Sequence, residues 1–292
     1  MSNHDLSQRF IFDDTDIRGE LVRLDDSYRS ALAAHDYPPA IHQLLGELSA
    51  CAVLLSATLK FKGTLSLQAR SNGPLTLLMV EINHKRQFRA LARFDDDKVA
   101  QQQSLHELMP DGQLVITIDP EQGKRYQGIV PFDGQTLEAC FAHYFAQSEQ
   151  LPTRLWLQAD TNTAFGLLLQ ALPGDQAKND EQASEDWNRM VQLADTLSRD
   201  EMLELPVDEL LHRLYHEETL RLFDPLAVQF HCNCSFERTG RALYGLGKTE
   251  VEKLLTEQPV IEIDCQFCSA QYHFSKTQVK ELFDSPPDGQ LH

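Results

Sequence analysis

Four of the chain's six cysteines form two close pairs near the C-terminus. Cys232 and Cys234 are separated by one residue, Cys265 and Cys268 by two, and 30 residues without cysteine lie between the pairs. Two such pairs brought together by a fold make a tetrahedral site of four sulfurs. Zinc is its usual occupant because Zn²⁺ accepts thiolates and needs only four ligands. The same spacing also permits two local disulfides. The pairs therefore indicate a metal site, a redox site or both.

The acidic composition limits the partners of the chain. It has 292 residues, enough for about two domains, and its formal net charge is -18. Nucleic-acid binding needs a surplus of Lys and Arg, so we expect no nucleic-acid partner. The N-terminus is polar and no run of roughly 18 apolar residues occurs, so we expect no membrane partner and a cytoplasmic location. Cytoplasmic thiols are kept reduced, which favours metal or redox chemistry over a structural disulfide framework.

Residues 1–174 alternate helical and strand patterns, as a mixed α+β core domain does. Apolar side chains recur at helical spacing with few charges over residues 39–61, which predicts a buried helix. A second helix is predicted at 136–150. Alternation or short apolar runs between turn residues predict strands at 63–70, 75–83, 87–94, 114–118, 126–132, 153–158 and 165–171.

Residues 175–231 are predicted to form an acidic helical linker. Residues 175–186 are polar and contain no core-forming side chain, and the whole segment carries 14 acidic and five basic residues. Ser198 and Glu201 stand three residues apart, as in a capping box at a helix N-terminus. Because like charges repel, we expect the segment to be marginal as an independent unit and to fold only against the two flanking domains.

Two apolar stripes run along the predicted linker helices. They consist of Trp187, Met190, Val191, Ala194 and Leu197, and of Leu210, Leu211, Leu214 and Tyr215. An apolar stripe on a surface helix packs against a neighbour, and it becomes exposed when the helix is released.

Residues 232–292 are predicted to form a small domain around the four cysteines, with a helix at 250–257 and a strand at 260–264. A metal would supply much of its folding free energy, on the order of 10–16 kcal/mol for zinc in isolated finger peptides. Oxidation of Cys265 and Cys268 would remove two ligands at once. In an extended chain the Cα atoms of Cys232 and Cys234 lie roughly 6.6 Å apart, close to the upper limit of about 6.8 Å for a relaxed disulfide. Such a bond is easily reduced, which suits a reversible switch.

The spacing alone leaves other uses of the cysteines open. A purely structural zinc site and an iron–sulfur site remain alternatives at this point. His231 and His273 flank the pairs, but four cysteines already fill a tetrahedron, so we expect both histidines to be solvated or hydrogen-bonded. Cys51 and Cys140 fall in predicted buried helices and are expected to be core residues. The sequence contains no Walker loop, dinucleotide fingerprint, HExxH motif or nucleophile elbow, so we expect no enzyme and no catalytic residue.

The chain resembles the 33 kDa chaperonin family, the redox-regulated heat-shock chaperones. The resemblance runs along the full length and rests on several short motifs together with the order and spacing of the cysteine pairs. The motifs are RGELV at 18–22, RYQGIV at 125–130, SEQLPTR at 148–154, LYHEE at 214–218 and DP at 224–225.

The resemblance implies a stress-response chaperone that holds unfolded proteins without ATP and is inactive while reduced and bound to one zinc ion. It implies that oxidation forms the redox-active disulfides Cys232–Cys234 and Cys265–Cys268, releases zinc and unfolds the linker. The resemblance also implies a homodimer formed through residues 1–174. The released stripes then become the predicted client-binding surface, with Trp187, Met190, Val191, Leu210, Leu211 and Leu214 as its candidates.

Two other functions remain as alternatives. A zinc-ribbon regulator that binds nucleic acid needs a basic face, yet residues 232–292 contain six Lys and Arg against nine Asp and Glu. A thiol oxidoreductase would place Cys265 and Cys268 at the start of a helix in a thioredoxin-like βαβ unit, and no such unit is predicted around them.

Overall fold

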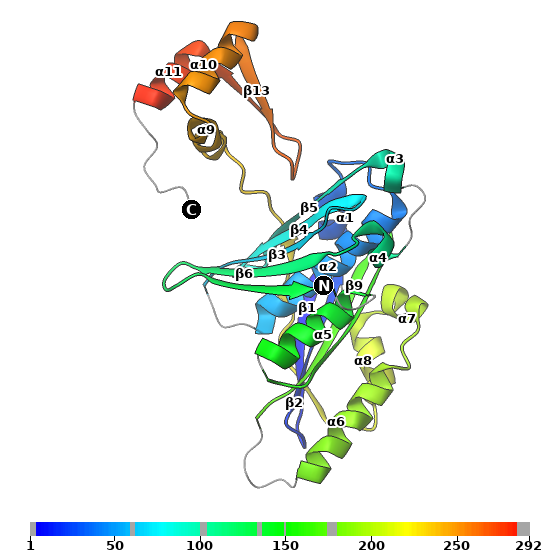
Figure 1. Cartoon of the computed structure of the whole chain (residues 1–292). Coiled ribbons are helices and arrows are strands. Elements are labelled where there is room, and N and C mark those ends of the chain that lie inside the picture. The colour runs from blue at the N-terminus through cyan, green and yellow to red at the C-terminus, as the bar shows by residue number, and fades with distance from the viewer. Residues whose placement is uncertain are drawn as a thin grey trace. The chain divides into compact units, whose positions relative to one another are not determined.

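The structure is a computed structural model that describes residues 4–58, 62–99, 104–132, 136–148, 150–173 and 180–284. It divides into two compact units, residues 1–231 and 232–292. Both units combine helices and strands, which confirms the predicted α+β class (Figure 1). Residues 175–231 belong to the first unit, so the separation of a linker from the core domain stays a proposal.

Two six-stranded sheets build the first unit. In the first sheet the strand order is β10-β1-β2-β9-β8, with β11 also pairing to β1, and in the second it is β12-β5-β4-β3-β6-β7. The strands of the first sheet are β1 (Leu6–Phe12), β2 (Ile17–Leu24), β8 (Thr153–Ala159), β9 (Ala164–Ala171), β10 (Leu220–Leu222) and β11 (Leu226–Ala227). Those of the second are β3 (Gly63–Arg70), β4 (Leu75–Asn83), β5 (Gln87–Phe94), β6 (Gln113–Pro120), β7 (Tyr126–Pro131) and β12 (Gln229–Phe230).

Helix α2 (Pro39–Thr58) lies between the two sheets and forms the centre of the core. It packs against β2, β8 and β9 of the first sheet and against β3, β4 and β5 of the second. Among the described residues α2 alone is long and apolar enough to suit a membrane span, but 72% of its apolar window is buried. The apolar composition of α2 is explained by its place in the core, where side chains of both sheets surround it.

The other helices of the first unit are short or lie at its surface. They are α1 (Asp26–Leu32), α3 (Asp96–Val99), α4 (Leu105–Leu108), α5 (Leu137–Ser148), α6 (Asp180–Ala194), α7 (Arg199–Glu204) and α8 (Val207–Tyr215). Helix α5 adds Leu137, Phe141 and Phe145 to the core around α2. Helices α6 and α8 cover the opposite face of the first sheet and share a second core with it.

The approach of β1 to β2 in this second core needs a residue without a side chain. Gly19 of β2 pairs with Phe10 of β1, and a Cβ atom at Gly19 would overlap the Phe10 ring. Phe10 is fully buried and its ring contacts that of Tyr215 in α8. Gly19 therefore allows Phe10 to lie flat on the sheet beneath α8.

Most predicted elements of the first unit are confirmed. All seven predicted strands occur within two residues of their expected limits, and so do both helices over the described residues. Within the predicted helical linker, α6 begins at Asp180, so the polar stretch 175–186 is helical from that residue onward, and Asp186 is buried. Its residues before 180 lie outside the described residues. The strands β1, β2, β10, β11 and β12 and the short helices α1, α3 and α4 were not predicted.

The second unit is a small α+β module. Its elements are α9 (Phe236–Gly245), α10 (Lys248–Glu257), β13 (Val260–Asp264), β14 (Gln271–Ser275) and α11 (Lys276–Asp284). Only five described apolar residues are buried in its core, namely Leu243, Val251, Ile261, Phe274 and Val279. So small a core supplies little net stability by itself, which makes a further source of folding free energy necessary.

Candidate metal centre

The four cysteines of the two pairs come from two places in the second unit. Cys232 and Cys234 precede α9, whose first turn is capped by the Ser235 hydroxyl accepting from the Arg238 amide. Cys265 and Cys268 lie in the turn between β13 and β14. Hydrogen bonds from the Cys265 amide to the Ala270 carbonyl and from the Ser269 amide to the Cys265 carbonyl close this turn.

The four Sγ atoms lie within 4.8 Å of one another. The Sγ atoms of Cys232 and Cys265 are 3.6 Å apart and those of Cys234 and Cys268 are 3.4 Å apart. A tetrahedral zinc site with Zn–S bonds of about 2.3 Å places its sulfurs roughly 3.8 Å apart. All six cysteines are free thiols in this structure. The four sulfurs therefore fit a single tetrahedral metal ion.

The pKa values of three cysteines in the cluster are shifted, and the shifts indicate how a bound cation would act on them. Partial burial, followed by hydrogen bonding to the neighbouring thiols, raises the pKa of Cys268, and burial also raises that of Cys232. Burial opposes ionisation of Cys234 as well, but hydrogen bonds from Tyr272 and from the other cysteines hold its pKa at about 7. Cys234 thus ionises more readily than Cys232 and Cys268. A bound cation would stabilise the thiolates of Cys232 and Cys268 by direct coordination.

Tyr272 is a positioning residue that the sequence analysis did not identify. Its hydrogen bond to Cys234 raises the pKa of the Tyr272 hydroxyl to about 12, so the hydroxyl keeps its proton and donates a hydrogen bond to the sulfur. The residue stands opposite Ile263 in the β13–β14 pair. This strand register brings the Tyr272 side chain to the cysteines. The position of Tyr272 in the sequence, four residues after Cys268, does not predict this contact.

The remaining candidate ligands lie outside the cluster. His231 and His273 are exposed, and the His273 ring is 3.6 Å from the Glu262 carboxylate. Cys51 and Cys140 are buried in α2 and α5, as predicted. Burial raises the pKa of the Cys51 thiol well above its usual value, which makes it a poor nucleophile.

The six predicted client-binding residues lie on α6 and α8, and most of them face the first sheet. Met190, Leu210, Leu211 and Leu214 are buried in the core they share with this sheet, and Trp187 packs at its margin. Val191 is half-buried and lies outside that cluster. On the sheet side the core contains Phe10, Phe12, Phe165, Leu167 and Leu169. The predicted surface is therefore covered in this structure.

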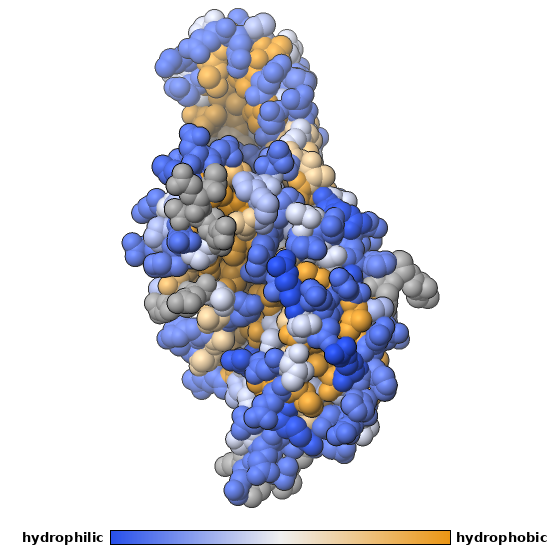
Figure 2. Space-filling model, turned by 90° about the vertical axis from the view of Figure 1, so that its right-hand side faces the viewer, coloured by the Kyte–Doolittle hydropathy of each residue, from blue (hydrophilic) through white to orange (hydrophobic). Residues whose placement is uncertain are grey.

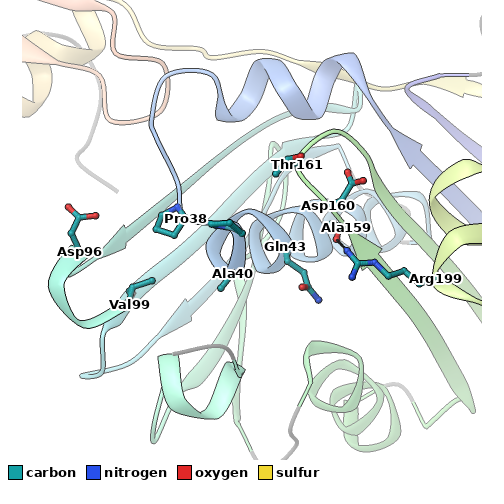
Figure 3. A pocket seen from close by; sticks show the side chains of 10 residues that line it. Pro38, Ala40, Gln43, Asp96, Val99, Ala159, Asp160, Thr161 and Arg199 are labelled. Atoms are coloured by element: carbon teal, nitrogen blue, oxygen red, sulfur yellow. Dashed lines mark hydrogen bonds between the residues drawn. The ribbon is translucent and has the colours of Figure 1, made fainter. Parts of the chain in front are cut away.

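Hydrogen bonds also connect residues 195–205, between α6 and α8, to the first sheet. The Trp156 indole donates to Asp195 at 2.9 Å, Arg23 to the Leu205 carbonyl at 3.1 Å, and Arg199 to the Ala159 carbonyl at 3.4 Å. The Arg199 contact lies beside a cavity of about 710 Å³, opposite Gln43 of α2 (Figure 3). These pairs could not be predicted from the sequence, since each joins residues far apart in the chain.

The chain is similar to known proteins along nearly its whole length. Residues 5–275 match the family described as Hsp33 protein. The proteins called 33 kDa chaperonin in Pseudomonas paraeruginosa and Azotobacter vinelandii are each 52% identical to it over 284 residues, which cover 97% of this chain and 96% of the relative. A solved structure of the 33 kDa chaperonin (heat shock protein 33 homolog) from Thermotoga maritima has a TM-score of 0.79 at 21% identity. The match covers 96% of this chain and 98% of that one, and it shows the same fold.

Zinc affinity should fall steeply as the pH falls. Cys232 and Cys268, whose pKa values are raised, keep their protons near neutral pH and must release both to bind zinc. The apparent affinity should therefore rise at least about 100-fold between pH 7 and 8. Below the Cys234 pKa of about 7 a third proton steepens the slope. Competition with a chelator of known pH dependence measures this, and a change of tenfold or less between pH 7 and 8 would contradict it.

Proposed function

Because the chain belongs to the Hsp33 family of chaperones, we propose that it is an ATP-independent holdase switched on by oxidation. In the reduced state one Zn²⁺ is held by Cys232, Cys234, Cys265 and Cys268. The convergence of four sulfurs within 4.8 Å is the observation that carries this proposal. The partners are unfolded proteins in the cytoplasm, and the active form is a homodimer.

The proposed switch is a two-electron oxidation of each cysteine pair. Peroxide takes two electrons from two thiolates, a disulfide forms between Cys232 and Cys234 or between Cys265 and Cys268, and the peroxide is reduced to water or hydroxide. Each disulfide removes two of the four ligands. Zinc then leaves, and the second unit, which has five buried apolar residues among those the structure describes, loses the folding free energy that the zinc–sulfur bonds supply.

Loss of order can spread along the chain from the cysteines to the docked helices. The segment between α8 and Cys232 contains β10, β11 and β12, which are only three, two and two residues long. They pair at the margins of the sheets, β10 and β11 with β1 and β12 with β5. Such short pairings open at low free-energy cost. We therefore place them as the path by which unfolding of the second unit releases α8.

Release of α6 and α8 would expose the client-binding surface. In the reduced state the described apolar faces of these helices pack against the first sheet. On the face shown in Figure 2, hydrophobic side chains gather in several patches bordered by hydrophilic ones. Undocking would add to these patches the apolar side chains of α6 and α8 that are now buried against the first sheet.

Oxidation of the zinc-loaded protein should release zinc and activate it together. Peroxide at elevated temperature is expected to release one Zn²⁺ per chain, measured with a chromogenic chelator, and to suppress aggregation of a thermally unfolded client, measured by light scattering. The reduced, zinc-loaded protein at the same temperature is the control. Zinc release without suppression of aggregation would overturn the chaperone switch.

Weakening the docked face should activate the chaperone without oxidant. Leu211 is almost fully buried between α8 and the first sheet, so Leu211→Ala should cost about 2–5 kcal/mol of docking free energy. We expect this variant to suppress client aggregation while it still holds one zinc ion. Glu209→Ala, on the exposed face of the same helix, is the matched control and should stay inactive. A Leu211→Ala variant with undocked α8 but no holdase activity would show that α8 does not mask the client surface.

A further inference from the structure

The second unit contains a pocket of about 360 Å³ between α10 and α11, away from the cysteines. These two helices pack against each other (Figure 1). Each contributes residues spaced three or four apart, so one face of each helix lines the pocket. The lining residues are Lys248, Glu252, Leu255 and Thr256 from α10 and Lys276, Val279, Lys280 and Phe283 from α11.

Positive charge gathers around this pocket in a unit that is otherwise acidic. Three of the six Lys and Arg between residues 232 and 292 are Lys248, Lys276 and Lys280. Within the described part of the chain, no carboxylate oxygen lies within 4.0 Å of any of these three ammonium groups, whereas Lys253 of α10 has Glu250 at 4.0 Å. One acidic residue, Glu252, lines the pocket. The lysines leave it with an excess of positive charge.

Two of the lysines occupy unfavourable helix positions. Lys248 is the first residue of α10, and Lys276 is the first residue of α11. A cation at a helix N-terminus is repelled by the positive end of the helix dipole. An anionic group bound between the lysines would relieve this repulsion at both helices. Departures of this kind from the local rule are typical of binding sites.

The floor of the pocket is apolar and continuous with the core of the unit. Val279 is buried in that core, and Leu255 and Phe283 pack against it while remaining half-exposed. Phe283 also lies against the ring of Tyr244 in α9, with centroids 5.0 Å apart. A bare inorganic anion would leave this apolar surface in water. A ligand with an apolar tail would cover it.

We propose that this pocket binds a medium-chain fatty carboxylate, with the carboxylate between the lysines and the alkyl chain on Leu255, Val279 and Phe283. The volume lies at the small end of the range of about 300–1,000 Å³ for small-molecule pockets, which suits one alkyl chain and excludes a helix. Binding would stabilise the folded second unit, since the ligand contacts both helices and the core. On the proposed function, it would therefore delay loss of zinc during oxidation.

Calorimetric titration of the full-length, reduced, zinc-loaded protein with decanoate below its micelle concentration tests the site. We expect one decanoate per chain, with octanoate about 15-fold weaker because each buried methylene contributes a factor of about four. Acetate, decanol and decyltrimethylammonium should bind at least tenfold more weakly than decanoate. Equal binding of decanoate and decanol would overturn the role of the lysines.

Variants separate this site from nonspecific binding to apolar surface. Lys276→Ala combined with Lys280→Ala should weaken decanoate binding at least tenfold, and Lys253→Ala, which changes a lysine of α10 outside the pocket, should leave it unchanged. Equal affinity in the double variant would overturn the proposal. A chain ending at Asp284 should bind decanoate as the full chain does. A gain of tenfold or more would assign the pocket to residues 285–292 instead and also overturn it.

The effect on the switch has a separate readout. Decanoate at 100 times its dissociation constant should slow peroxide-driven zinc release up to about 100-fold, and only in proteins that keep Lys276 and Lys280. Binding without any change in the release rate would overturn the regulatory part and leave the site standing. If peroxide releases no zinc even without decanoate, the proposed redox function fails, while the calorimetric result still decides the site.

Discussion

The mutual repulsion of four sulfur ligands at one point governs the second unit. Four deprotonated thiols within 4.8 Å of one another would repel one another, and burial, followed by hydrogen bonding to neighbouring cysteines, already raises the pKa values of Cys232 and Cys268. Coordination by a divalent metal would turn the repulsion into attraction. The described part of this unit has five buried apolar residues around a two-stranded sheet, so the metal–sulfur bonds would be a large part of its stability. Oxidation removes ligands and stability in the same step.

The first unit has a different source of stability. Its central helix α2 is enclosed by two sheets, and the core around it extends from Val22 to Val228. This core is built from buried apolar side chains. The helices α6 and α8 add a second, smaller core on the outer face of the first sheet, where an acidic segment is held by apolar packing and by a few polar contacts. A stable core thus carries a weaker layer, and the weaker layer holds the apolar faces proposed to bind clients.

The sequence predicted the local features better than their partners in space. The spacing of the cysteines was sufficient to predict one four-sulfur cluster, because each pair fixes two ligands locally. The capping box of Ser198 and Glu201 was predicted correctly for the same reason, since both residues lie in one helical turn. The amphipathic stripes of α6 and α8 were visible as well. The surface that these stripes cover could not be predicted, because an apolar stripe does not indicate which element packs against it.

Two further features depended on register and pairing. Tyr272 reaches Cys234 only because β13 and β14 pair with Ile263 opposite Tyr272. The strands β10, β11 and β12 are too short to show any alternation, and their pairing with β1 and β5 alone defines them. These strands join the docked helices to the cysteines. The path by which the proposed switch acts could therefore not be predicted from the sequence.

Amide hydrogen exchange across the oxidative transition tests the central claim, that loss of metal at the cysteines undocks α6 and α8. Exchange is compared between the reduced, zinc-loaded protein and the same protein after peroxide has released its zinc. The account predicts loss of protection first in residues 232–284, then in 220–230, and then in 180–215, while α2 and β3 to β6 stay protected. Retained protection of residues 180–230 after complete zinc release would contradict it.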